Sequence, residues 1–106
     1  MLVCQWHLDI VYGKQAEAVR IMREWGADKF ASSEFRLARG ARLLVGFIGE
    51  SASHVVDEYY FASLADFETA LGSMAAPRFR AHSEALAPYI VPGSQHWVVY
   101  RVLSEP

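Results

Sequence analysis

The first stretch of the chain, residues 2 to 12, alternates strictly between two kinds of side chain. One face is apolar or aromatic and consists of Cys4, Trp6, Leu8, Ile10 and Tyr12. The other face carries three polar side chains, Gln5, His7 and Asp9, with a valine on either side of them. A period of two residues is typical of a β-strand. We therefore expect a strand that turns its apolar face toward the core and leaves the polar face open.

Residues 14 to 25 change to a period of three and four, which predicts a helix. Its apolar stripe consists of Ala18, Ile21, Met22 and Trp25. Gly26 follows the stripe, and glycine is the residue type that ends many helices. Residues 27 to 40 fit two descriptions, a longer helix or a loop held to the core by its aromatic side chains, and the pattern favours neither.

Two apolar segments, residues 41–49 and 54–61, predict a hairpin of strands because they are rich in β-branched and aromatic residues and only a short turn-like link separates them. Ser63 then opens a helix, with Asp66 three residues later as in a helix-capping pair. A second helical segment starts at Pro77, and residues 95–103 form the last strand.

The predicted order of elements is β-α-β-β-α-β. The right-handed crossover rule folds this order into a four-stranded antiparallel sheet, with strand order 4-1-3-2 and two helices on one face. We therefore expect an α+β, ferredoxin-like fold, in which residues 1–106 form a single domain.

The other face of such a sheet has to meet water or another protein. The chain is 53% apolar and 21% charged, against averages of roughly 45–50% and about 25%. The excess falls largely on segments 41–49 and 95–103, which are apolar on both faces. An exposed apolar patch of that size is rare, so we expect two copies to pair face to face and enclose a cavity.

The net charge and the cysteine content limit which binding partners and which cellular compartment are expected. The net charge of −2 and the pI of about 6 argue against nucleic acid, and no apolar run is long enough for a membrane span. A single cysteine, Cys4, cannot form an internal disulfide. Together with the lack of an export signal, this predicts a cytoplasmic protein.

The second half of the chain resembles a known superfamily. The segments FASLADFETAL, APRFRAHSEALAPYI and VPGSQHWVVYRVL, between Phe61 and Leu103, are similar to the dimeric α+β barrel superfamily and, within it, to the small NIPSNAP-like proteins. This resemblance implies a ferredoxin-like protomer and a homodimer that forms a dimeric α/β barrel. It implies no single activity, since relatives of this fold include cofactor-free monooxygenases, haem-binding enzymes and isomerases.

His7 and Asp9 are the candidate catalytic pair. They lie two residues apart on the central strand, so they point the same way, about 7 Å apart. A carboxylate beside an imidazole can fix its tautomer and increase its basicity for proton abstraction. The alternative interpretation is that the pair bridges the dimer or bonds buried backbone groups.

Further polar residues on the neighbouring strands are candidates for binding a ligand. His54 and Glu58 share one face of their strand and Asp57 and Tyr59 the other, and the sequence does not decide which face is inward. Arg101 can clamp a carboxylate or form a surface ion pair. The predicted ligand-binding set is Gln5, His54, Glu58, Tyr59, Tyr100 and Arg101.

No metal or cofactor is predicted. The chain has no HxH, HExxH or cysteine-histidine spacing, and an amphipathic stripe explains the helical His82 without haem. We expect a protein that binds a small apolar or aromatic molecule, between sheet and helices or between protomers. Two alternatives stay open, namely a cofactor-free monooxygenase or isomerase with His7 as base, and a purely structural or interaction module.

Overall fold

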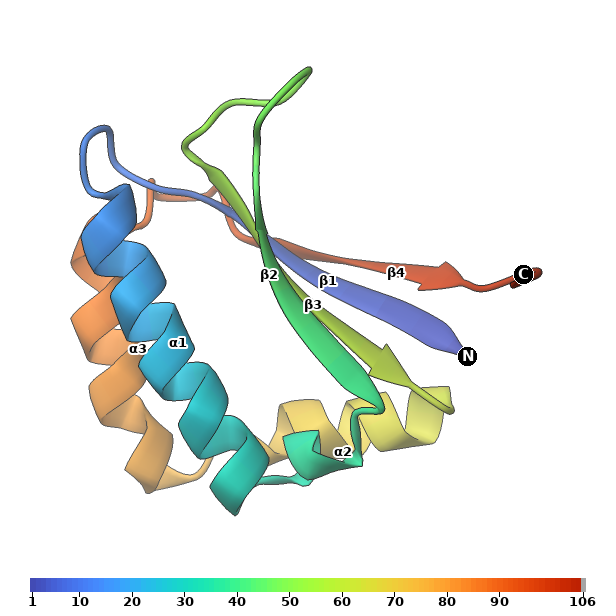
Figure 1. The fold of residues 1–106 in the computed structure, drawn as a ribbon. Helices are drawn as coiled ribbons and strands as arrows, with labels where there is room; N and C mark the ends of the chain where they lie inside the picture. The colour runs from blue at the N-terminus through green and yellow to red at the C-terminus, as the bar shows by residue number, and fades with distance from the viewer. Residues whose placement is uncertain (106) are drawn as a thin grey trace.

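The computed structural model describes residues 1–105 and contains a four-stranded antiparallel sheet with its helices on one face (Figure 1). The strands are β1 (Leu2–Asp9), β2 (Gly40–Val45), β3 (His54–Phe61) and β4 (His96–Arg101). The helices are α1 (Gln15–Ser32), α2 (Leu64–Ser73) and α3 (Arg80–Leu86), with short 3₁₀ turns η1 (Glu34–Leu37), η2 (Pro77–Phe79) and η3 (Ala87–Tyr89).

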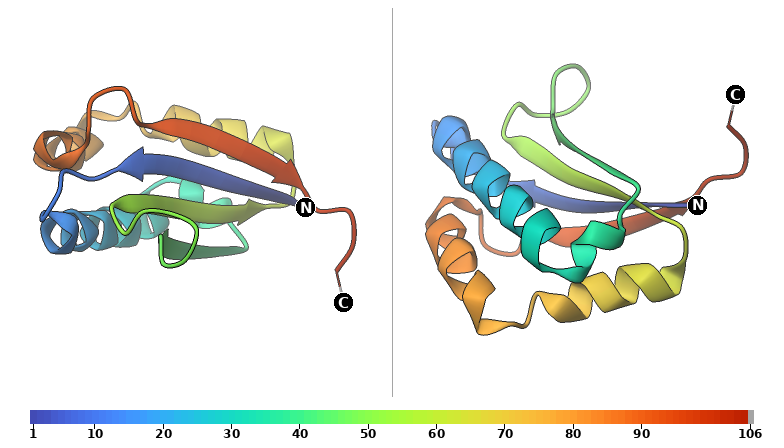
Figure 2. Two further views of the ribbon diagram at one scale, coloured as in Figure 1. Left: turned by 90° about the horizontal axis from the view of Figure 1, so that it is seen from above. Right: turned by 60° about the horizontal axis from the view of Figure 1, so that its bottom comes forward.

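The sheet has the predicted topology. Its strand order is β2-β3-β1-β4, which is 4-1-3-2 read from the other edge. The N-terminal strand β1 is central and pairs antiparallel with both β3 and β4. Figure 2 shows the helices together on one side of the sheet. The α+β, ferredoxin-like fold expected from the sequence is therefore confirmed.

The first helix is longer than its apolar stripe suggested. It passes through Gly26, the candidate end of the helix, and continues to Ser32, so the first part of residues 27–40 is a helix extension, one of the two descriptions left open by the sequence. The chain leaves the helix at Ser33, whose extended backbone and side-chain bond to the Phe35 amide begin η1. Phe35 is fully buried there and holds this turn to the core.

Pro77 divides the second helical region. Ala76, the residue before it, is extended, as the proline ring requires. Helix α2 therefore ends before this point and α3 starts after it, so the second helical region of the predicted order is divided at Pro77, where the sequence predicted a new helical segment.

The hairpin strand that was predicted to run to residue 49 is shorter. β2 ends at Val45, and the chain then leaves the sheet. A Cβ at Gly46 would overlap the backbone of Ser51, so only glycine allows this close crossing. Phe47 and Ile48 follow at the tip, 90% and 87% exposed, so the expectation that they lie in a buried strand is wrong.

The core lies between the sheet and the helices. The predicted inward face of β1 is confirmed, since Cys4 and Leu8 are fully buried and Ile10 is 1% exposed. Leu8 and Ile10 pack with α1 and Leu86, and Cys4 packs with η1 and α2. No helix within residues 1–105 is both long and apolar enough to cross a bilayer.

Candidate functional site

The register of the sheet decides which polar residues meet. Gln5 lies opposite Glu58 and Asp9 lies opposite His54, while His7 lies between them. Because residues opposite each other share a face, these five side chains lie together on the face away from the helices. We call it the open face. The sequence left open which face of this strand points to the core; Asp57 and Tyr59 do so, while His54 and Glu58 lie on the open face.

The predicted ligand-binding set is divided between the two faces. Tyr100 lies opposite Val3 and shares the open face with Gln5, His54 and Glu58. Tyr59 and Arg101 lie opposite Cys4 and Leu2, so they are on the other face of the sheet, toward the helices. The structure therefore places four of the six predicted residues on the same face as His7 and Asp9, and puts Tyr59 and Arg101 on the other face.

A continuous line of hydrogen bonds crosses the open face. Asp9 Oδ1 contacts His54 Nδ1 at 2.7 Å, and His54 Nε2 contacts His7 Nδ1 at 2.8 Å. His7 Nε2 contacts Gln5 Oε1 at 2.8 Å, and Gln5 Nε2 donates to Glu58 Oε1 at 2.8 Å. We call these five residues the polar ladder.

The polar ladder links His7 to Asp9 through His54. Asp9 bonds the ring of His54, and that ring in turn contacts His7. Burial is the largest cause that lowers the pKa of His7, and the neighbouring imidazole rings of His54 and His96 add to it, against an opposing influence from Glu50. The environment of His7 therefore favours its neutral form.

Glu58 is the charged end of the polar ladder. Its side chain is 2% exposed, and it accepts bonds from Arg42 and from the Tyr60 hydroxyl as well as from Gln5. Burial alone would raise the pKa of Glu58, but the hydrogen bonds from Arg42, Gln5 and Tyr60 outweigh it and hold this pKa below its usual range. Glu58 is therefore a carboxylate at neutral pH.

A cavity of about 720 Å³ lies over the polar ladder, between the open face and the loop that joins β2 to β3. His7, His54 and His96 contribute polar lining, and Glu50 lies at the same loop. Its apolar lining comes from Leu44, Val45, Phe47, Ile48 and Val56. This is the open-face cavity.

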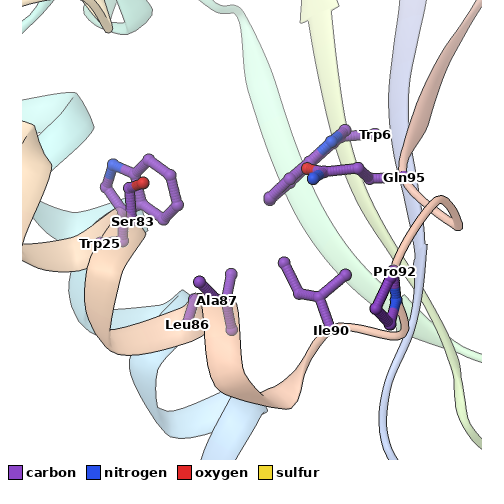
Figure 3. A pocket seen from close by; sticks show the side chains of 8 residues that line it. All are labelled: Trp6, Trp25, Ser83, Leu86, Ala87, Ile90, Pro92 and Gln95. Carbon is purple, nitrogen blue, oxygen red and sulfur yellow. The ribbon is translucent and has the colours of Figure 1, made fainter.

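A second cavity, of about 320 Å³, lies between the sheet and helix α3. Figure 3 shows Trp6 on the sheet side and Trp25 on the helix side, with the Gln95 amide and the Ser83 hydroxyl directed into the space between them. The remaining lining is apolar: Leu86, Ala87, Ile90 and Pro92. We call it the helix–sheet cavity.

A buried charge beside the helix–sheet cavity was missed by the sequence reasoning. Lys29 is 4% exposed, and its Nζ lies 3.3 Å from Asp57 Oδ2 and 3.1 Å from the Tyr59 hydroxyl. The same Nζ lies 4.5 Å from the centre of the Trp25 ring. Burial lowers the pKa of Lys29, while Asp57 opposes this effect. The signal was its spacing, four residues after Trp25 on the apolar stripe.

His82, the helical histidine considered for haem, contacts Asp28 on the neighbouring helix α1. Its Nε2 lies 3.0 Å from Asp28 Oδ2, and its ring stacks on Trp25 at a centroid distance of 6.0 Å. Within residues 1–105, no group of three or more histidine, cysteine, aspartate or glutamate residues is arranged to hold a metal ion.

Comparison with solved structures places this geometry among known folds. A NIPSNAP family protein from Agrobacterium tumefaciens C58 is 25% identical, with a TM-score of 0.73 over 94% of this chain and 90% of that one. The fold is NIPSNAP-like. A NIPSNAP domain protein from Burkholderia xenovorans shares this NIPSNAP-like fold at 20% identity and a TM-score of 0.74, over 100% of this chain and 99% of that one.

The same fold also occurs in oxygenases. SnoaB of Streptomyces nogalater, described as a cofactor-independent oxygenase, is 19% identical in a variant form, with a TM-score of 0.69 over 98% of this chain and 95% of that one. No family model and no curated protein matches the chain. The resemblance to NIPSNAP-like proteins seen in the sequence is confirmed at the level of the fold.

Proposed function

We propose that this protein binds a small, flat, apolar molecule in the helix–sheet cavity. The observation that carries the proposal is the pairing of two indole walls, Trp6 and Trp25, with two polar groups that face each other across the space, Ser83 and Gln95. Neither of these two side chains bonds another part of the described chain, so both are available to a ligand. A volume of about 320 Å³ suits a ligand of one or two rings.

The test compares two substitutions on neighbouring positions of the same helical segment. Ala87→Phe places a ring in the helix–sheet cavity, whereas Ala85→Phe adds the same ring to an exposed position outside it. Native mass spectrometry of freshly purified protein should show a bound small molecule on wild type and on Ala85→Phe, and bare chain for Ala87→Phe. A visible absorption scan of the same samples identifies a coloured ligand. Equal ligand content in both variants would contradict the proposal.

We further propose that two copies pair through their open faces. Val3, Leu44, Val98 and Tyr100 surround the polar ladder, and Tyr100 is 56% exposed in the single chain. Covering these side chains would remove apolar surface from water, which is the main driving force of association. Sedimentation at micromolar concentration should give a dimer, and Tyr100→Glu should give a monomer. A wild-type monomer at that concentration would contradict this part of the proposal.

A second candidate is a cofactor-free monooxygenase or isomerase, favoured by the fold shared with an oxygenase of that description. In this candidate His7 is the base, and Asp9 orients it through the ring of His54. Substitution of His7 by alanine should then lower turnover of an active preparation at least about a hundredfold. His82→Ala, on the other side of the sheet, is the matched control, and unchanged turnover in His7→Ala would remove the assignment.

A further inference from the structure

Trp25 carries a hydrogen-bond donor for which the chain supplies no acceptor. Among residues 1–105, its indole Nε1 is the only buried side-chain nitrogen or oxygen without a hydrogen-bond partner. An indole nitrogen can only donate, and buried donors without an acceptor are rare in folded proteins. The ring is held by stacking on His82 and by the Lys29 ammonium, itself paired with Asp57, at 4.5 Å from the ring centre. The direction of this N–H is therefore a fixed feature of the fold.

The Trp25 ring belongs to the walls of two cavities. Besides the helix–sheet cavity, it lines a cavity of about 290 Å³ between the end of α2 and the start of α3, which we call the helix-junction cavity. Trp25 and Ser83 line both cavities, so the two spaces share this wall. Figure 3 shows the nitrogen of the Trp25 ring turned away from Trp6, which lines only the helix–sheet cavity. We therefore assign the unsatisfied N–H to the helix-junction side of the wall.

A positive charge without a partner lies at the same cavity. Arg80 lines the helix-junction cavity, is exposed, and forms no ion pair within residues 1–105. The neighbouring charges are already used, because the two carboxylate oxygens of Asp28 contact Arg78 and His82. Glu84, one helical turn after Arg80, forms no ion pair with it in the described part of the chain. The cavity therefore combines a buried donor with an arginine, and no carboxylate of the chain serves either of them.

We propose that the ligand of the helix–sheet cavity is an aromatic carboxylate, whose rings lie between Trp6 and Trp25 and whose carboxylate group enters the helix-junction cavity. This inference rests on the proposed function and names the chemical class of its ligand. A carboxylate only accepts hydrogen bonds. It therefore complements the indole N–H of Trp25, the guanidinium of Arg80 and the hydroxyl of Ser83, all of which can donate.

The ligand has access to both cavities in the proposed dimer. They lie on the helix side of the sheet, so pairing of two copies through their open faces leaves them uncovered (Figure 2). Trp25 Nε1 is covered by neighbouring atoms, so the carboxylate reaches it only when a side chain at the shared wall turns aside. Ser83 and Arg80 are exposed and can turn in this way. Binding of a carboxylate should therefore change the surroundings of the Trp25 nitrogen.

The first experiment compares two probes with the same rings. 2-Naphthoate and 2-naphthamide are similar in shape, but only 2-naphthoate is charged at pH 7, because carboxyl groups ordinarily titrate near about pH 4. By calorimetry we expect wild type to bind 2-naphthoate about threefold to tenfold more tightly than 2-naphthamide, the value of charge-assisted contacts at a partly exposed site. Arg80→Gln, a change at an exposed position, should abolish this preference.

Arg23→Gln is the matched control, because Arg23 is an exposed arginine of α1 that lines neither cavity. It removes the same charge and should keep the preference. Equal affinity of wild type for the two probes, survival of the preference in Arg80→Gln, or its loss in Arg23→Gln would overturn the inference. The proposed function would still stand in these cases, because the probes bind. If neither probe binds, the proposed function fails and the inference fails with it.

The second experiment locates the carboxylate by nitrogen-15 NMR of the indole N–H groups. In the 2-naphthoate complex the Trp25 signal should lie downfield of its position in the 2-naphthamide complex, because a charged acceptor forms the stronger hydrogen bond. Trp97 lines neither cavity, so its signal should be the same in both complexes. The same Trp25 signal in both complexes, or an equal difference at Trp97, would overturn the assignment of the carboxylate to this wall.

Discussion

Replacing Lys29 by methionine removes a buried positive charge that lies between helix α1 and strand β3 of the sheet. The two side chains have similar length, so the change tests the charge more than the packing. The ammonium of Lys29 contacts Asp57 Oδ2 at 3.3 Å and the Tyr59 hydroxyl at 3.1 Å. Its side chain is 5% exposed and that of Asp57 is 15% exposed. After the substitution, Asp57 keeps only the bond from Tyr59, at 2.6 Å.

The size of the effect follows from these contacts. Removal of one partner of a buried ion pair costs about 3–5 kcal/mol. Asp57 retains some exposure and the hydroxyl bond of Tyr59, and the cost of burying the ammonium disappears. We therefore expect Lys29→Met to lower the free energy of unfolding by about 2–3 kcal/mol.

The assay is urea unfolding at pH 7 and one fixed protein concentration, followed by circular dichroism and by tryptophan emission. Lys14→Met, an exposed position at the start of the same helix, is the control and should change stability by less than about 0.5 kcal/mol. The double variant Lys29→Met with Asp57→Asn leaves no unpaired charge and should recover at least half of the loss.

Two results would refute this reasoning. If Lys29→Met is as stable as wild type, or more stable, the Lys29–Asp57 pair contributes nothing that packing cannot replace. If the double variant is as unstable as Lys29→Met alone, the loss does not come from the charge left on Asp57.

Three further predictions concern other parts of the molecule. The pKa of Glu58 is lower in the folded state than its ordinary 4.5, so its contribution to stability is present above pH 4.5 and is lost as the pH falls through the folded-state pKa. Glu58→Gln should therefore flatten the dependence of the free energy of unfolding on acid pH, measured by urea unfolding, and an unchanged pH dependence would contradict this. Burial raises the pKa of Cys4 to about 11, so Ellman's reagent at pH 8 should label it only after unfolding, and labelling of folded protein would count against burial. Gly46→Ala should destabilise the fold because its Cβ would overlap Ser51, whereas Gly26→Ala, with open space in a helix, should stabilise it by roughly 0.5–1 kcal/mol; equal effects would argue against the tight crossing.

The topology was predictable because its signals are local. The alternation along residues 2–12 predicted the strand and its buried face, and Cys4 and Leu8 are fully buried as expected; the strand ends at Asp9, however, and Tyr12, expected on the apolar face, is 93% exposed. The ends of elements were less predictable. Gly26 does not end α1, because a glycine with an ordinary helical backbone can lie inside a helix that tertiary packing stabilises.

The candidate site was predictable only in part, because it depends on register. Placing Gln5, His7 and Asp9 on one face needs only their spacing. The contact of Asp9 with His54 depends on how β1 aligns with β3, and no single strand contains that information. Lys29 was missed for another reason, since its partner Asp57 lies on a distant strand and makes burial of the charge possible.

The most direct test of the proposed function uses the indole N–H signals of the three tryptophans, observed by nitrogen-15 NMR during a titration with 2-naphthol. Trp6 and Trp25 line the helix–sheet cavity and Trp97 does not, so the protein contains its own control. We predict saturable shifts at Trp6 and Trp25 that are several-fold larger than the shift at Trp97, and their loss in Ala87→Phe. Shifts of equal size at all three tryptophans, or unchanged shifts in Ala87→Phe, would contradict binding in the helix–sheet cavity.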